Sequence, residues 1–241
     1  MQKICIVIPC YNEQFRLPTE EFSIGYNTFH YYYLFVNDGS QDLTISILNE
    51  FRKEKEDRVS ILDCKENCGK AEAVRKGVLA ALKQQDFSVI GYLDADLATP
   101  LSEISAIVNQ ISGDIHFAFG SRIKRIGANI KRKWYRHILG RIFATIASKL
   151  LKIGVYDTQC GAKFFDKNII ENLFSEKFET KWIFDLELFF RFKNLYKNID
   201  INSVAKEVPL ENWKDVGGSK LKLTHLFKIP WELAKLWKRK K

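Results

Sequence analysis

The chain has 241 residues, 46% of them hydrophobic and 28% charged, with a formal net charge of +9, which is typical of a soluble globular protein with one large core. It contains no apolar stretch of 18 or more residues, so a membrane-spanning helix is not expected. Pro9 and Glu13 close the N-terminal apolar run, so this run is typical of a first strand and not of a signal peptide.

The first half of the chain alternates between strand patterns and helix patterns. Continuous β-branched and aromatic runs predict strands, which cover residues 3–9, 32–40, 58–64, 87–96 and 114–121. After the second strand, Ser40 is a predicted N-cap for a helix that carries Leu43, Ile47 and Phe51 on one face. A second helix is predicted from Gly69 to about Gln85. This alternation with short connections predicts an α/β fold with a doubly wound parallel sheet.

The positive charge lies in one segment that follows these strands. Between Asp114 and Asp157 the chain has ten Lys or Arg residues and no acidic residue, so the rest of the chain is nearly neutral. Segments of this kind are typical of proteins that contact nucleic acid, anionic lipid or phosphate.

The second half of the chain follows a different pattern. A basic loop leads to a predicted helix over 134–154, which has Ile138, Ile142, Ile146 and Leu150 on one face. Further helices are predicted from Asn168 and over 184–196, with a strand near 203–210 and an amphipathic, basic tail at the end. Repeats and low-complexity linkers are absent, so we predict one domain over 1–218, with halves 1–121 and 122–218, and a tail over 219–241.

Five scattered cysteines suit a reducing compartment. Cys64 and Cys68 have no His or Cys partners at a spacing that zinc would need, so no zinc site is predicted.

Polar clusters follow three of the predicted strands. They are "CYNE" after the first, "NDGS" at the end of the second and "DAD" at the end of the fourth. Ligands of such sheets bind outside the carboxyl ends of the strands, so the three clusters predict a site at one edge.

Asp94 and Asp96 lie two residues apart on an extended backbone, so both carboxylates can face one ligand while Ala95 points away. Paired carboxylates suit Mg²⁺ or Mn²⁺ together with substrate phosphates. The alternative interpretation is a solvated turn, but the neighbouring clusters favour a metal site held by Asp94 and Asp96.

Eight ordered blocks cover most of the chain, namely "IVIPCYNE", "VNDGS", "NCGKAEAVRKG", "DADL", "GSR", "DTQCGAKFF", "WIFDLEL" and "VPLENWKDVGGSK". With these blocks the chain resembles the family-two inverting nucleotide-sugar glycosyltransferases, and among them the branch that glucosylates dolichyl or polyprenyl phosphate. The resemblance implies a GT-A-like, Rossmann-type α/β fold, with a mostly parallel central sheet and helices on both faces.

The resemblance also implies roles for individual residues. The nucleoside pocket and the diphosphate would be bound by ten positions, which are Pro9, Tyr11, Asn12, Glu13, Asp38, Gly69, Lys70, Asp94, Ala95 and Asp96. Of these, Asp38 would hold the base or ribose. Ser121 and Arg122 would lie by the sugar or the acceptor. The sequence departs from the family pattern at Asn37, where an Asp is common, and at Ala98, where mannosyl-transferring relatives have a Gln that assists the metal.

The acceptor decides what further chemistry is needed. A hydroxyl acceptor would need a carboxylate base, for which Asp157, Asp185 and Glu187 are the candidates. A phosphate acceptor is already anionic and needs cations instead, and Arg122, Arg132 and Arg136 are the predicted clamps.

Together with these site residues, the resemblance implies transfer of a hexose, most simply glucose from UDP-glucose, to a polyprenyl phosphate. The enzyme would use Mg²⁺ or Mn²⁺ and work peripherally at the cytoplasmic face of an anionic membrane. The alternatives are a hydroxyl acceptor in cell-surface glycan synthesis, mannose transfer from GDP-mannose, a non-catalytic nucleotide sensor, and a nucleic-acid-binding protein that uses the basic segment over 122–152. The intact carboxylate set argues against the sensor, and a nucleic-acid partner is not expected.

Overall fold

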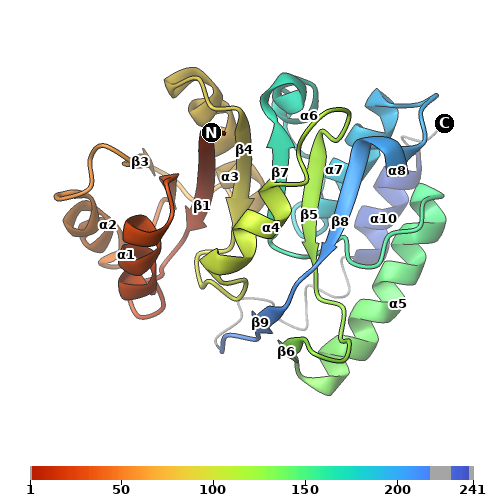
Figure 1. The fold of residues 1–241 in the computed structure, drawn as a ribbon, viewed down its shortest axis with the longest axis horizontal. Coiled ribbons are helices and arrows are strands. Elements are labelled where there is room, and N and C mark those ends of the chain that lie inside the picture. Colours follow the sequence, from red (N-terminus) through yellow and green to blue (C-terminus); the bar gives the residue numbers. More distant parts are fainter. Residues whose placement is uncertain (1, 218–228, 239–241) are drawn as a thin grey trace.

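The structure is a computed structural model that describes residues 2–217 and 229–238 (Figure 1). In this part of the chain, seven strands form the main sheet in the order β3-β2-β1-β4-β7-β5-β8. They are β1 (Ile4–Cys10), β2 (Tyr31–Asp38), β3 (Val59–Cys64), β4 (Val89–Leu93), β5 (Phe117–Ser121), β7 (Ala162–Asp166) and β8 (Ala205–Pro209). Strand β7 runs antiparallel to both its neighbours, β4 and β5, and all other pairs are parallel. The prediction of a mostly parallel sheet is confirmed.

Helices cover both faces of this sheet, as predicted (Figure 1). One face packs against α1 (Thr19–Thr28), α2 (Thr44–Arg52), η1 (Leu101–Glu103) and α4 (Ile104–Val108). The other packs against α3 (Lys70–Gln84), α5 (Trp134–Leu151), α6 (Ile170–Phe174) and α7 (Phe184–Leu195). Strand β1 is apolar throughout because both of its faces are buried, with Val7 in one core and Ile6 and Ile8 in the other.

Smaller elements complete the described chain, namely η2 (Lys167–Ile169), α8 (Ile201–Val204), β6 (Asn129–Lys131) and β9 (Asn212–Lys214). The last two pair in parallel as a separate sheet of two strands. The backbone N–H of Lys214 donates to Ala98 O at 3.0 Å, so this small sheet is attached to the loop that follows β4.

The predicted helix start at Ser40 is wrong, because α2 begins at Thr44. Ser40 Oγ accepts a hydrogen bond from Asn12 N at 3.0 Å, and Asp42 Oδ1 accepts from Thr44 N at 3.0 Å. The loop is therefore held by the chain segment after β1, a long-range contact that helix-capping rules do not include.

The predicted tail lies partly outside the described residues, which exclude 218–228 and 239–241. Its described part is α10 (Ile229–Lys238), which packs on the body. Leu236 is buried in the core, and the Glu232 carboxylate accepts hydrogen bonds from Trp182 N and Ile183 N, both at 3.2 Å. Trp231, in contrast, is exposed. None of the described helices combines the length and the apolar character that crossing a bilayer requires.

Candidate active site

The loops after β1, β2 and β4 meet at one edge of the sheet, because these three strands are neighbours in the order β2-β1-β4. Glu13 N donates to Thr44 Oγ1 at 2.8 Å, and Asn12 Oδ1 accepts from Gln41 N at 2.9 Å. Asn12 has a positive φ of 49°, a backbone conformation that asparagine tolerates better than most residues. The structure thus brings the predicted polar clusters together.

The paired carboxylates of Asp94 and Asp96 lie at this edge and both contact cations of the chain. Lys70 Nζ is 2.5 Å from Asp94 Oδ1, and Arg16 Nη2 is 3.1 Å from Asp96 Oδ2. Burial and the nearby charge of Asp94 together raise the pKa of Asp96. Leu97, the next residue, has a φ of 48°, which is rare for its type and is typical of strained functional loops.

Gly161 makes room for the Asp94 carboxylate. A Cβ atom on Gly161 would lie 1.9 Å from Asp94 Oδ2, closer than any nonbonded contact, so a side chain at this position would force the carboxylate to move. The backbone also joins the two residues, since Asp94 N donates to Gly161 O at 3.1 Å. The sequence contains this glycine in the block "DTQCG", but its role depends on the antiparallel β4–β7 pairing, which the sequence patterns did not reveal.

Lys70 is the first residue of α3, and Asp38 fixes the loop that leads to it. Asp38 Oδ1 accepts from Cys68 N at 2.9 Å, and Asp38 Oδ2 accepts from Gly69 N at 2.7 Å and Asn67 Nδ2 at 3.1 Å. Gly69 has a φ of 88°, which favours glycine. The Asp38 carboxylate thereby orders this loop, and its contact with a base or ribose stays a prediction.

Electrostatics at Lys70 reflect the acidic groups around it. Partial desolvation alone would lower the pKa of its ammonium group, but the charges of Asp94 and Asp185 outweigh that effect and raise the pKa above its usual range. Lys70 is therefore positively charged at the place where the sequence predicts a diphosphate.

The remaining predicted donor residues surround these groups. Pro9 in β1 and Tyr11 just after it are partly exposed at the site edge, whereas Ala95 is buried between the two aspartates. Arg16 was not predicted, because no motif marks it, yet it links the loop after β1 to Asp96 and lies 3.8 Å from Glu13.

Arg122 and Asp157 form a buried, two-pronged ion pair. Arg122 Nε and Nη2 lie 2.6 Å and 2.8 Å from Asp157 Oδ2 and Oδ1, and the Arg122 guanidinium lies 5.3 Å from the Trp213 ring. Burial alone would raise the pKa of Asp157, but the Arg122 guanidinium beside it lowers that pKa to about 2. The preceding Ser121 is also buried, and its Oγ has no hydrogen-bond partner among the described residues.

Asp185 and Glu187 both lie in the first turn of α7 but have different surroundings. Asp185 Oδ1 accepts from Tyr92 Oη at 2.5 Å and from the fully buried Lys163 Nζ at 2.6 Å. Glu187 accepts from Thr180 N at 3.0 Å and from Arg191 Nη2 at 2.9 Å. Asp185 therefore belongs to the buried groups beside Lys70, whereas Glu187 holds a loop onto α7.

The other two predicted phosphate clamps are Arg132 and Arg136. Arg132 lies against Gly140 of α5, since a Cβ atom on that glycine would be 2.5 Å from Arg132 Nη2. The backbone of Arg136 is part of α5, but its side chain lies outside the described residues. A clamp formed by these arginines stays a prediction.

A divalent cation fits the Asp94–Asp96 pair, although the described residues contain no group of three or more His, Cys, Asp or Glu side chains that could hold a metal ion alone. Two carboxylates are what Mg²⁺ and Mn²⁺ commonly take from a protein when substrate phosphates complete the shell. Burial and the charge of Asp94 both disfavour the ionised form of Asp96 and raise its pKa, and the positive charges of Lys70 and Arg16 offset these effects in part.

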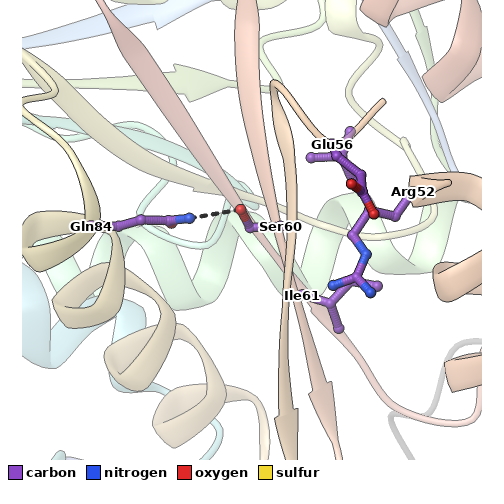
Figure 2. A pocket seen from close by; sticks show the side chains of 6 residues that line it. Arg52, Glu56, Ser60, Ile61 and Gln84 are labelled. Atoms are coloured by element: carbon purple, nitrogen blue, oxygen red, sulfur yellow. Dashed lines mark hydrogen bonds between the residues drawn. The ribbon is translucent and has the colours of Figure 1, made fainter. Parts of the chain in front are cut away.

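A pocket of about 410 Å³ lies away from this site, at the start of the outer strand β3 (Figure 2). Its lining is mostly polar, with Gln84 Nε2 donating to Ser60 Oγ at 2.7 Å, and it includes Arg52, Glu56, Val59 and Ile61. Val59–Ile61 begin β3, whereas the site residues follow strand ends, so this pocket lies at the opposite end of the strands.

Comparisons with known proteins agree with the geometry. The family model described as glycosyl transferase family 2 matches residues 5–174. Dolichyl-phosphate beta-glucosyltransferase of Dictyostelium discoideum is 30% identical over 234 residues, which are 90% of this chain and 68% of the relative. The protein of the same name from Drosophila melanogaster is 31% identical over 236 residues, which are 91% of this chain and 69% of the relative.

Among solved structures, glucosyl-3-phosphoglycerate synthase of Mycobacterium tuberculosis, in complex with Mn²⁺, UDP-glucose and phosphoglyceric acid, superposes with a TM-score of 0.68. The alignment covers 98% of this chain and 80% of that one at 13% identity, so the likeness concerns the fold.

Proposed function

Because the chain belongs to glycosyl transferase family 2, we propose that it transfers glucose from UDP-glucose to the phosphate of dolichol or another polyprenol. The two relatives named dolichyl-phosphate beta-glucosyltransferase support this choice of sugar and acceptor, since the likeness extends over about nine-tenths of the chain. The geometry of the site supports it independently, on the donor side and on the acceptor side.

On the donor side, Asp94 and Asp96 would hold a Mg²⁺ or Mn²⁺ ion, and through it the diphosphate of UDP-glucose. Such an ion would supply positive charge to offset the negative charge that builds on the leaving diphosphate. Lys70 and Arg16, which contact these carboxylates, add positive charge at the same place. Gly161, which has no Cβ atom, leaves the space that the Asp94 carboxylate occupies.

On the acceptor side, one observation carries the proposal: each of the three candidate bases is held by a cation of the chain. Asp157 is paired with Arg122, Asp185 with Lys163, and Glu187 with Arg191. A carboxylate paired with a cation is a poor proton acceptor. The pKa of Asp157 is accordingly lowered to about 2, which leaves this group a weak base. An acceptor that needs no base therefore fits best.

A phosphate monoester is such an acceptor, because its second pKa lies near ~6 and it is already anionic at neutral pH. One of its oxygen atoms forms a bond to the anomeric carbon of glucose as the bond from that carbon to the diphosphate breaks. The electron pair of the broken bond leaves with UDP, and no proton has to be removed. Attack on the face opposite the diphosphate inverts the anomeric centre.

We place this reaction at the cytoplasmic side of a membrane. The acceptor is a membrane lipid, and the free cysteines fit a reducing compartment.

The test is label transfer from UDP-glucose, with polyprenyl phosphate and hydroxyl-bearing glycans offered separately. We expect the label in the lipid product, in a reaction that requires Mg²⁺ or Mn²⁺. Asp96→Ala should lower the rate by more than about 100-fold with an unchanged fold. Asp114→Ala, at an exposed carboxylate before β5, is the matched control. Transfer only to a glycan, or from GDP-mannose in preference to UDP-glucose, would show that the proposal is wrong.

A further inference from the structure

Helix α5 presents a broad apolar face to solvent. Its members are between 40% and 74% exposed and comprise Trp134, Tyr135, Ile138, Leu139, Ile142 and Ile146. At about 100° per residue they fall within an arc of about 140°. The opposite side of the same helix is buried in the core through Ala144, Ala147 and Leu151. We call the exposed set the apolar face of α5, and α5 lies at the outer edge of the molecule (Figure 1).

Exposed cations flank the apolar face at both ends of the helix. Lys131 and Lys133 precede it, and Lys149 and Lys152 lie in and just after its last turn. No acidic residue occurs between Asp114 and Asp157, so nothing within this segment neutralises them. An apolar patch of this size is typical of an interaction site, and its basic border indicates an anionic partner.

The start of α5 and a residue near its middle both connect to segments of the active site. Strand β6 directly precedes α5 and pairs with β9, whose Lys214 N donates to Ala98 O beside the aspartate pair. From within the helix, Arg141 Nη1 donates to Tyr156 O at 3.3 Å, next to Asp157. A partner bound along α5 is therefore adjacent to the segments that reach the site.

We propose that the apolar face of α5 inserts into the interfacial region of an anionic phospholipid bilayer. The apolar side chains enter the boundary between headgroups and acyl chains, and the flanking lysines contact lipid phosphates. The choice of a lipid partner rests in part on the proposed function, whose acceptor is a membrane lipid. A second copy of the chain fits less well, because two α5 helices face to face would bring lysines together without any acidic residue of this segment between them.

The test measures sedimentation of the full chain with vesicles of phosphatidylcholine, with and without phosphatidylglycerol. We expect binding to the anionic vesicles that weakens with salt. The double variant Ile138→Glu/Ile142→Glu should partition at least about tenfold less. Ile24→Glu, on α1, is the matched control, because Ile24 is 59% exposed and Ile142 is 54% exposed. It should bind within about twofold of the wild type. Equal melting temperatures of all three proteins show that the fold is intact.

A second measurement separates this inference from the proposed function. Glucose transfer is assayed with long-chain polyprenyl phosphate in vesicles and with a short, water-soluble prenyl phosphate. The double variant should lose at least about tenfold on the first and stay within about twofold on the second. If glucose is transferred to neither lipid, the proposed function is wrong. Vesicle binding by the wild type that the double variant loses would still support membrane binding by the apolar face of α5. The inference is wrong if the double variant binds vesicles as well as the wild type does. It is also wrong if neither protein binds vesicles and the wild type forms a dimer that the double variant does not form.

Discussion

A side chain at Gly161 should displace the Asp94 carboxylate, which occupies the space of a Cβ atom. In Gly161→Ala the new carbon would lie 1.9 Å from Oδ2, 2.3 Å from Cγ and 2.7 Å from Oδ1 of Asp94. The carboxylate must therefore leave its place and its 2.5 Å contact with Lys70. It is partly exposed and can turn toward solvent, so the free energy of unfolding should fall by only about 1–2 kcal/mol.

The loss of activity in Gly161→Ala should be much larger than its loss of stability. A misplacement of about 1 Å in a group that positions the substrate can cost about 100-fold in rate. We therefore expect kcat/KM to fall by about 100-fold or more, which corresponds to about 2.7 kcal/mol of transition-state stabilisation. The affinity for UDP in the presence of Mn²⁺ should fall as well.

The measurements are melting temperature, titration calorimetry with UDP and Mn²⁺, and label transfer. Gly154→Ala is the matched control, because a Cβ atom at Gly154 has no neighbour within 4 Å. Adding Gly161→Ala to Asp94→Ala should cost little further activity, since the clash is with the side chain that Asp94→Ala removes. Wild-type turnover and Mn²⁺-dependent UDP affinity in Gly161→Ala would refute the role of this glycine.

Three further predictions concern the acidic groups and the acceptor. The pKa of Asp157 is lowered from 3.8 to about 2, so its stabilising contribution is complete above about pH 4 and is lost as the pH falls toward about 2. Asp157→Asn should lower the free energy of unfolding by about 3–5 kcal/mol at neutral pH and flatten this acid limb in denaturant titrations. Glu187→Gln should reduce the free energy of unfolding by about 2 kcal/mol and leave kcat within about threefold of the wild-type value. A large loss of kcat in a stable protein would instead indicate that Glu187 acts as a catalytic base. The transfer rate at low acceptor concentration should rise with pH and level off above ~6, where the acceptor phosphate is fully ionised. With a phosphonate acceptor of higher pKa, the rise in rate should move to higher pH. An unchanged pH profile would show that ionisation of the acceptor does not cause the rise.

The fold and the donor edge could be predicted because local patterns determine them. The apolar runs that form β1, β2 and β4 end in polar residues, and the adjacency of parallel strands then brings Asn12, Asp38 and Asp94 to one edge. Strand register decides such a site, and register follows from which residues are buried.

Contacts between distant segments could not be predicted in the same way. Strand β7 enters the sheet antiparallel between β4 and β5, and only this pairing places Gly161 against Asp94 and Lys163 beneath Asp185. Asp185 and Glu187 look alike in sequence, being two residues apart in one helical turn. The cation that holds Asp185 comes from β7, whereas Glu187 is held by the loop before α7 and by α7 itself. Only the packed structure therefore separates their roles.

The charge of the basic segment has two different uses that a count of residues does not distinguish. Arg122 and Arg125 are paired with acids of later segments, Asp157 and Glu211, so they stabilise the fold around the site and add little net field. The lysines at the ends of α5 stay exposed, and they border a face whose isoleucines are unfavourable in water. Helix α5 leaves most of its large apolar residues exposed, whereas an ordinary surface helix turns such residues inward. Binding of α5 to a lipid surface would remove this cost and at the same time hold the active site beside an acceptor that stays in the membrane.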